Sequence, residues 1–249
     1  MKSKGKKGLG SSVSDLPADL KAVVFDVDGT LYHLRGLQRA VQIYFLRGHW
    51  HKPFEASRVR RAIRAYRRAA ETLRLLPAQG IELAESQIEF ATKSCGLPKE
   101  YIRACVHRWM AEEPLAFLPR FRYEGVQEVL SELRQRGLHL AVFSDYPAQA
   151  KLHAMELGDV FELVMSAQDP DVQMFKPDPR GLKVVLERMG VEANQAIYVG
   201  DRPAIDGVAA ERAGMAWLIA GDGHRNPQKS FRELRDLLLS AKTKRSTRL

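Results

Sequence analysis

Two carboxylates separated by one residue follow a short apolar run near the start of the chain. The run 23–25 (VVF) stops at Asp26, and Asp28, Gly29 and Thr30 come directly after it. On an extended backbone, residues two apart point to the same side, so both carboxylates are expected to face one crevice. Carboxylates held this close repel one another unless a positive group lies among them. The spacing therefore indicates a site built around a cation.

Further residues capable of chemistry follow three later apolar runs. Ser144 lies in LHLAVFSD, Lys176 in MFKPDP, and Asp201 in AIYVGD, with Asp206 five residues on. In a parallel sheet the carboxyl ends of the strands form one edge, and ligands bind beyond it. An oxygen-rich set of ligands without sulfur is what Mg²⁺ prefers, with water and substrate phosphate completing its shell. We therefore expect these residues to form one Mg²⁺ site.

The elements that must position these residues alternate between strand and helix. Apolar runs rich in Val, Ile, Phe and Leu predict strands at 22–25, 138–143, 163–165, 196–199 and 216–219. Apolar residues at helical spacing predict helices over 126–136 and 181–189, each followed by a glycine. Alternating strands and helices favour an α/β fold with a Rossmann-like parallel sheet and helices on both faces.

A long segment interrupts this alternation after the first strand. Residues 34–118 are Arg-rich, contain several prolines and have mostly helical patterns. Residues 33–122 hold 17 Lys and Arg against 8 Asp and Glu, a net charge of +9. The rest of the chain, apart from its two basic ends, is net negative. We therefore expect an α-helical cap at 34–118 inserted into an α/β core made of 21–33 and 119–240.

The overall charge of +9 comes largely from the two ends of the chain. Residues 1–20 and 241–249 are predicted to be basic tails, so no specific nucleic-acid partner is expected. No uncharged apolar run approaches the length of a membrane span, and the basic N-terminus has no apolar region typical of a secretory signal. Cys95 and Cys105 have neither zinc-site nor disulfide-framework spacing, and a cytoplasmic location is expected.

The motifs DVDGTLY, FSD, the lysine of KPDP and GDRPAID, in this order, resemble the four motifs of the haloacid dehalogenase superfamily of hydrolases. The resemblance extends from about residue 21 to residue 219, and the helical insert resembles the C1 type of cap in phosphoglycolate phosphatase-like members. It implies a Mg²⁺-dependent phosphatase that hydrolyses a small phosphorylated metabolite, a phosphate ester, through an aspartyl-phosphate intermediate.

The resemblance also implies a role for each motif residue. Asp26 would be the nucleophile, and Asp28 would give a proton to the leaving oxygen and later take one from the attacking water. The first three motifs would also supply the residues that bind the phosphate group. These are Gly29, Thr30, Ser144 and Lys176.

The metal ligands implied by the resemblance are Asp26, Asp201 and the main-chain carbonyl of Asp28. Asp206 would not bind the metal itself but would orient the residues that do. Tyr32 and His33 stand where many members have acidic or small residues, so their role is open.

Alternative functions remain open at this point. Sugar phosphomutases of the same superfamily share the two acids and a helical cap, whereas Asp28 speaks against a dehalogenase or a phosphonatase. A non-catalytic protein could use the basic cap and tails for binding, although such a module has no need of a nucleophile. The substrate's identity and the oligomeric state are not fixed by the sequence.

Two further residue groups have simpler interpretations. Asp145 is interpreted as a turn residue before Tyr146 and a proline. The run 58–68 is typical of a solvated helix face, and we hypothesise that at least one cap arginine contacts substrate, with Arg60, Arg64, Arg67 and Arg68 as candidates.

Overall fold

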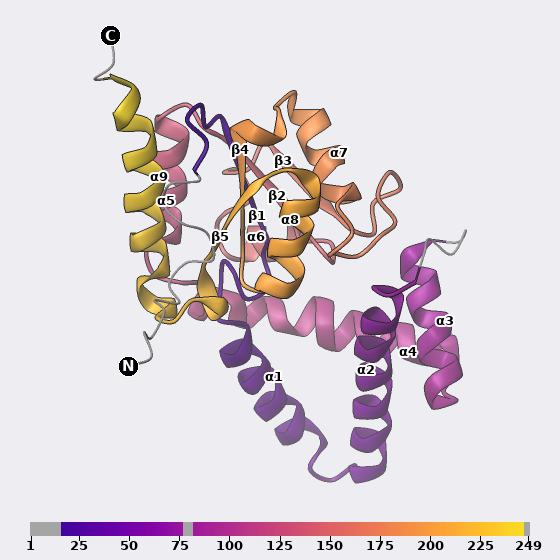
Figure 1. Ribbon diagram of the computed structural model, residues 1–249. Helices are drawn as coiled ribbons and strands as arrows, with labels where there is room; N and C mark the ends of the chain where they lie inside the picture. Colours follow the sequence, from indigo (N-terminus) through magenta and orange to yellow (C-terminus); the bar gives the residue numbers. More distant parts are fainter. Residues whose placement is uncertain (1–15, 77–81, 247–249) are drawn as a thin grey trace, which may run out of the picture.

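A five-stranded parallel sheet lies at the centre of the computed structural model, which describes residues 16–76 and 82–246 without the side chains of 239–246 (Figure 1). The strands follow the order β3-β2-β1-β4-β5. Their bounds are β1 Ala22–Phe25, β2 His139–Ser144, β3 Leu163–Ser166, β4 Ala196–Gly200 and β5 Ala216–Ile219. All five predicted strands are therefore present, and each observed end lies within one residue of the predicted end.

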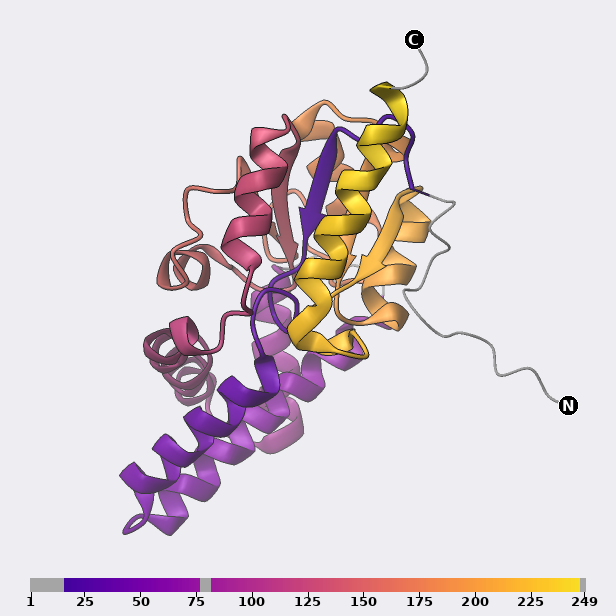
Figure 2. The same ribbon diagram turned by 90° about the vertical axis from the view of Figure 1, so that its left-hand side faces the viewer.

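Alternate residues of each strand point to opposite faces, and both faces are apolar. Val23 and Phe25 of β1 pack into one hydrophobic cluster, whereas Ala22 and Val24 pack into another. The first face is covered by α5 (Val126–Gln135), α6 (Gln149–Ala154) and α9 (Ser230–Ser246), and the second by α7 (Arg180–Met189) and α8 (Val208–Ala213). Figures 1 and 2 show these two helical layers on either side of the strands. The predicted α/β fold, buried on both faces, is confirmed.

Helices also fill the stretch between β1 and β2. They are α1 (Leu34–His49), α2 (Pro53–Leu73), α3 (Leu83–Cys95) and α4 (Lys99–Val106), followed by a π-helical turn at His107–Glu112 and a 3₁₀ turn at Glu113–Arg120. In Figure 2 the α1–α2 pair projects away from the sheet. The described part of this segment is thus a helical cap, as expected for the fold.

The cap has a hydrophobic cluster of its own. Buried alanines of α2, among them Ala62 and Ala69, allow close approach to α3 and α4, which contribute Ile88, Ala91 and Ile102. Leu73 at the end of α2 instead joins the core cluster on the α7–α8 face of the sheet. The cap is therefore a separately packed unit whose α2–α3 end lies against the core.

The described ends of the chain also contact the core. Leu20 is buried against it, and the main-chain N–H of Lys21 donates to Gln195 over 2.8 Å. The expected N-terminal tail falls mostly on residues 1–15, which lie outside the described residues. Helix α9 continues to Ser246, within the stretch expected to be the second tail. Within the described residues, no helix is both long enough and apolar enough to span a membrane.

Candidate active site

The first, second and fourth strands bring three of the predicted motifs to one edge of the sheet. Phe25, the last residue of β1, is aligned with Val142 of β2 and Val199 of β4. The next residue, Asp26, donates its main-chain N–H to Val199 over 2.8 Å. Ser144 closes β2 and Asp201 follows β4, so all three motifs meet beyond the carboxyl ends of neighbouring strands.

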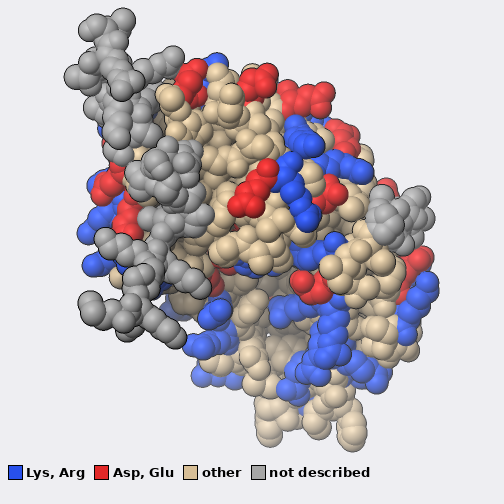
Figure 3. Space-filling view, viewed as in Figure 1, with Lys and Arg blue, Asp and Glu red and all other residues tan. Residues whose placement is uncertain are grey.

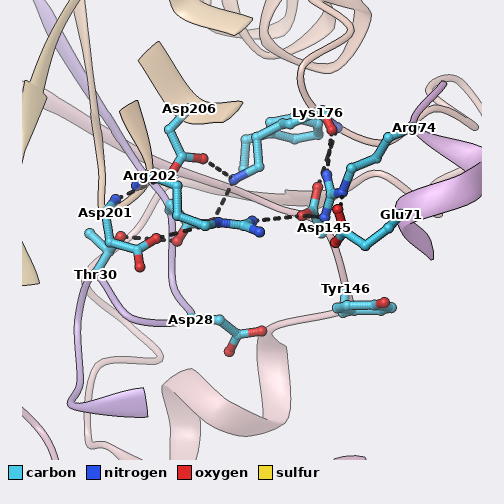
Figure 4. Close-up of polar contacts among 12 residues, drawn as sticks. Asp28, Thr30, Glu71, Arg74, Asp145, Tyr146, Lys176, Asp201, Arg202 and Asp206 are labelled. Atoms are coloured by element: carbon cyan, nitrogen blue, oxygen red, sulfur yellow. Dashed lines mark hydrogen bonds and ion pairs between the residues drawn. The ribbon is translucent and has the colours of Figure 1, made fainter. Parts of the chain in front are cut away.

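Lys176 is the centre of the polar contacts at this edge (Figure 4). Its Nζ atom lies 2.7 Å from Asp26 Oδ1, 2.7 Å from Asp206 Oδ1 and 2.8 Å from the phenol oxygen of Tyr198. The lysine is fully buried. Burial alone would lower its pKa, but the carboxylates of Asp206 and Asp26 outweigh this and hold the pKa well above its usual value. Lys176 is therefore a fixed positive charge beside Asp26.

The Asp26 carboxyl is held at both oxygens. Oδ1 accepts from Lys176, and Oδ2 accepts from the Thr30 hydroxyl over 2.9 Å. Burial raises the pKa of Asp26 to about 6, and Lys176 partly offsets this rise. The hydroxyl of Thr30, predicted to bind phosphate, is thus already donated to Asp26, and its main-chain N–H donates to Val27.

Three carboxylates form a group with the spacing of a metal site. Asp26, Asp201 and Asp206 each offer an oxygen, and these oxygens lie within 4.8 Å of one another. Burial, followed by repulsion from Asp26 and Asp206, raises the pKa of Asp201 to about 8. Its buried Oδ1 atom has no hydrogen-bond partner among the described residues. A hard cation would satisfy this oxygen and relieve the repulsion.

Asp206 differs from the other two because both of its oxygens are engaged. Oδ1 accepts from Lys176, and Oδ2 accepts the main-chain N–H groups of Asp201 and Arg202 at 3.1 and 2.8 Å. It therefore fixes the loop after β4 and orients Asp201. This arrangement suits the predicted role of Asp206 as a group that positions the ligands.

Gly29 is required by the close approach of two loops. Its φ of +91° lies in the left-handed region, and a Cβ atom here would lie 2.5 Å from Asp201 Oδ2. The glycine thus lets the chain turn after the two acids while Asp201 comes close.

Asp28 lies apart from the metal-spaced group, as Figure 4 shows. Lys151 of α6 contacts both of its oxygens, at 2.6 and 2.7 Å, and the Tyr32 hydroxyl donates to Oδ1. Burial would raise the pKa of Asp28, but Lys151 and Tyr32 outweigh it and lower the pKa. The Asp28 carboxylate therefore does not belong to the metal-spaced group and is held by Lys151 and Tyr32 instead.

Ser144 is buried, and its hydroxyl has no hydrogen-bond partner among the described residues. A buried hydroxyl without a partner is costly, so such a group favours a ligand that accepts a hydrogen bond from it. This environment suits the predicted contact with phosphoryl oxygens.

Asp145 has more partners than a turn residue needs. Its Oδ2 atom lies 2.6 Å from Arg74 Nη2 and 3.1 Å from Arg202 Nη2. Burial would raise its pKa, but Lys176 and Arg74 outweigh it and hold the pKa at about 2. Arg74 also donates to the main-chain oxygen of Lys176. Because Arg74 follows α2, this cluster joins the cap to the core.

His33 is turned toward a loop of the core. Its Nδ1 atom lies 3.0 Å from Asp222 Oδ1 and accepts the main-chain N–H of Gly36, which caps α1. The ring also stacks on Tyr123 at 6.1 Å. These contacts place His33 at the start of the cap, against the core loop that carries Asp222.

Four residues of the site were not identified from the sequence: Arg74, Lys151, Tyr198 and Arg202. Lys151 lies on α6 and Arg74 directly follows α2, and basic residues at such positions are usually solvated. Tyr198 belongs to an apolar strand, and only its phenol oxygen reaches Lys176. Arg202 lies inside the motif GDRPAID, and its position directly after Asp201 is the one clue that could have identified it.

The comparisons with known proteins agree with this geometry. Residues 20–214 match the family described as haloacid dehalogenase-like hydrolases, and the chain belongs to this family. It is an enzyme of the hydrolase class, and the predicted phosphoglycolate phosphatase-like character is confirmed.

Two curated relatives share most of their length with this chain. A phosphoglycolate phosphatase of Rhodospirillum rubrum is 32% identical over 85% of this chain and 84% of its own. A protein named pyrophosphatase PpaX, from Bacillus velezensis, is 27% identical over 80% of this chain and 85% of its own. The predicted enzyme class, a phosphoric monoester hydrolase, agrees with the phosphatase names among these relatives.

Solved structures share the fold. The match to a haloacid dehalogenase-type phosphatase from Thermococcus onnurineus extends over 88% of this chain and 98% of that protein, with a TM-score of 0.54 and 24% identity. The match to a 2-haloacid dehalogenase from Pseudomonas syringae extends over 89% of this chain and 99% of that protein, with a TM-score of 0.59 and 21% identity. At these identities the likeness concerns the sheet and cap, not the reaction.

Proposed function

We propose that this hydrolase is a Mg²⁺-dependent phosphatase that cleaves a small phosphate ester through an aspartyl phosphate on Asp26. The observation that carries the proposal is the position of Asp26, held between Lys176 and Thr30 at the edge where Asp201 approaches. A carboxylate fixed in this way is suited to attack, and Lys176 offsets its repulsion from an anionic substrate.

Two displacements make up the proposed reaction. An Asp26 oxygen forms a bond to phosphorus while the bond from phosphorus to the ester oxygen breaks, and Asp28 gives its proton to that leaving oxygen. Water then attacks the phosphorus and gives a proton to Asp28, and the bond to Asp26 breaks. Inorganic phosphate leaves, and both carboxyls return to their starting states.

The environment of Asp28 suits the second displacement directly. With its pKa lowered by Lys151, Asp28 is ionised and ready to accept a proton from water. The first displacement requires a protonated Asp28, so the contacts with Lys151 and Tyr32 must loosen when substrate binds. Lys151 is therefore proposed as a positioning residue for Asp28.

The residues present fit a magnesium ion. Asp26 and Asp201 would hold it, together with the predicted main-chain carbonyl of Asp28, and Asp206 would orient them. When bound, the ion would supply charge stabilisation for the transferring phosphoryl group. Ser144 would donate its free hydroxyl to the same group, and the main chain around Gly29 and Thr30 would lie against it.

Arg74 is a further cap arginine to consider besides the four named from the sequence, because it donates to Asp145 and to the main-chain oxygen of Lys176. With Arg202 it surrounds Asp145 at the edge of the crevice. We propose that these two guanidinium groups select substrates whose non-reacting end is anionic. The phosphatase names of the relatives support this class of substrate.

The cytoplasmic location expected from the cysteines stays a prediction.

The proposal is tested by incubating the protein with Mg²⁺ and a panel of phosphorylated metabolites, with phosphate release as the readout. Release from at least one carboxylated or phosphorylated metabolite, abolished by a chelator, is expected. Transfer of phosphate between sugar positions without release would indicate a mutase instead.

A further inference from the structure

A basic groove lies between α2 and α3 on the cap. Its lining residues are Arg61, Arg64, Ala65, Arg68, Ala69 and Thr72 of α2, with Phe90, Ser94 and Cys95 of α3. The groove has a volume of about 630 Å³, within the range of sites for small ligands. None of these residues belongs to the proposed catalytic group.

Among the described residues, the three arginines of the groove have no acidic partner. None of them forms an ion pair with another residue in the described part of the chain. The glutamates of the two helices are already paired with other cations. Glu55 lies 3.8 Å from Lys52, Glu71 lies 3.3 Å from Arg74, and Glu85 and Glu89 lie 2.6 and 3.0 Å from Lys99.

The positions of the arginines place like charges next to one another. Arg61 and Arg64 are three residues apart, and Arg64 and Arg68 are four apart, so they are neighbours on the helix surface. Like charges at this spacing are mildly destabilising. Figure 3 shows Lys and Arg gathered over α2 in the lower part of the view. An anion in the groove would neutralise these charges where no carboxylate does.

The other lining groups define which anion fits. The hydroxyls of Thr72 and Ser94 donate to helix carbonyls, those of Arg68 and Ala91, so the guanidinium groups are the available donors. Along the helix, Arg61 and Arg68 are separated by a rise of about 10 Å. One phosphate group is too small to engage the whole row, whereas a ligand with two or more phosphates can. Phe90 gives the groove one aromatic wall.

We propose that this groove is a second ligand site, separate from the catalytic crevice, which binds a small anion carrying two or more phosphate groups. Guanidinium groups bind phosphate as forked donors, which favours this chemistry over a single carboxylate. The site lies on α2, the helix that Arg74 follows, so its ligand would bind the same helix that joins the cap to Asp145.

The test measures binding of inorganic tripolyphosphate by calorimetry to the full chain carrying Asp26→Asn, which leaves the probe intact, at 0.15 M salt. The groove variant adds Arg64→Ala and Arg68→Ala. The matched control adds Arg60→Ala and Arg67→Ala, which remove the same charge from the same helix outside the groove. Alanine is the better helix former, and thermal midpoints check that both variants fold. An Arg64→Gln, Arg68→Gln pair replaces the groove variant if it fails to fold.

The groove variant is expected to bind tripolyphosphate at least about tenfold more weakly, because two charge-assisted contacts are lost. The control is expected to stay within about twofold. Equal weakening in both variants, unchanged binding in both, or no binding to the parent protein at millimolar probe would overturn the proposal. Tighter binding of a short single-stranded oligonucleotide through the same two arginines would also overturn it, in favour of a nucleic-acid surface. The measurement needs no turnover, so its outcome is independent of the proposed phosphatase activity.

Discussion

Arg74 at the end of the cap helix α2 and Asp145 after strand β2 form a buried ion pair, with 2.6 Å between Nη2 and Oδ2. Only 7% of the Arg74 side chain and 6% of the Asp145 side chain are exposed. A buried pair of this kind is costly to break because the Asp145 carboxylate then keeps its charge with Arg202 as its remaining ion-pair partner. The cap and the crevice are therefore coupled at this point.

Replacing Arg74 by alanine is expected to lower the free energy of unfolding by about 1–3 kcal/mol, the usual range for lost hydrogen bonds to a buried charge that keeps a second partner. Arg202 provides that second partner for Asp145. Urea unfolding of Arg74→Ala measures the change. Arg103→Ala is the control because the Arg103 side chain is 50% exposed in its pair with Glu85, and a change below about 1 kcal/mol is expected there. Equal effects in the two variants would contradict a coupling role for Arg74.

Lowering the pH should weaken the contribution of the Asp145 carboxylate to the free energy of unfolding over a defined pH range. Its pKa of about 2 in the folded protein lies below the usual value of about 3.9 in an unfolded chain. The contribution is therefore fully present above about pH 4 and is lost as the pH falls through about 2. The difference in unfolding free energy between wild type and Asp145→Asn should shrink over this window. A difference that stays constant down to pH 2 would contradict the assignment, and the exposed Asp171→Asn serves as the control.

Magnesium should stabilise the protein more at high pH than at low pH. Without metal, the pKa values of Asp201 and Asp26 are raised to about 8 and about 6, so folding favours their protonated forms. The stability they give is greatest below about pH 4 and is lost as the pH rises through these values. Metal binding requires the ionised forms. Thermal midpoints with Mg²⁺ and with a chelator should therefore differ more at pH 8.5 than at pH 5.5, and the reverse order would exclude this ligand set.

Asp28→Asn should slow proton transfer by about 10²–10⁴. The loss should be smaller for a nitrophenyl phosphate than for an alkyl phosphate, because a good leaving group needs little help from an acid. Turnover numbers for both esters, measured with the same enzyme preparation, check this expectation. If the two losses are equal, Asp28 is not the general acid.

The sheet and the meeting of the motifs could be predicted because both depend on local patterns. Strand β1 is an apolar run that ends at a pair of acids, and the same kind of ending recurs at Ser144 and Asp201. Once the strands are parallel neighbours, their ends must lie together. The resemblance of the motifs to a known family predicts a lysine beside Asp26, and Lys176 lies 2.7 Å from Asp26 Oδ1.

The contacts that Arg74 and Lys151 make at the site could not be predicted, because these two residues lie outside the motifs and far from their partners in the sequence. Arg74 and Asp145 are 71 positions apart, and Lys151 and Asp28 are 123 apart. Helical arginines and lysines look alike in a sequence whether they face water or a carboxylate. The four cap arginines considered as substrate contacts illustrate this, since Arg64 and Arg68 line the α2–α3 groove and Arg60 and Arg67 do not.

The role of Asp26 is tested most directly by phosphate release from Asp26→Asn, compared with wild type under saturating Mg²⁺ and the best substrate found. The variant keeps the size of the side chain but removes the attacking charge and a proposed metal ligand. Turnover is expected to fall by at least about 10³, as when one member of a catalytic unit is removed. Turnover within tenfold of wild type, in a variant whose thermal midpoint shows it is folded, would contradict an aspartyl-phosphate mechanism on Asp26.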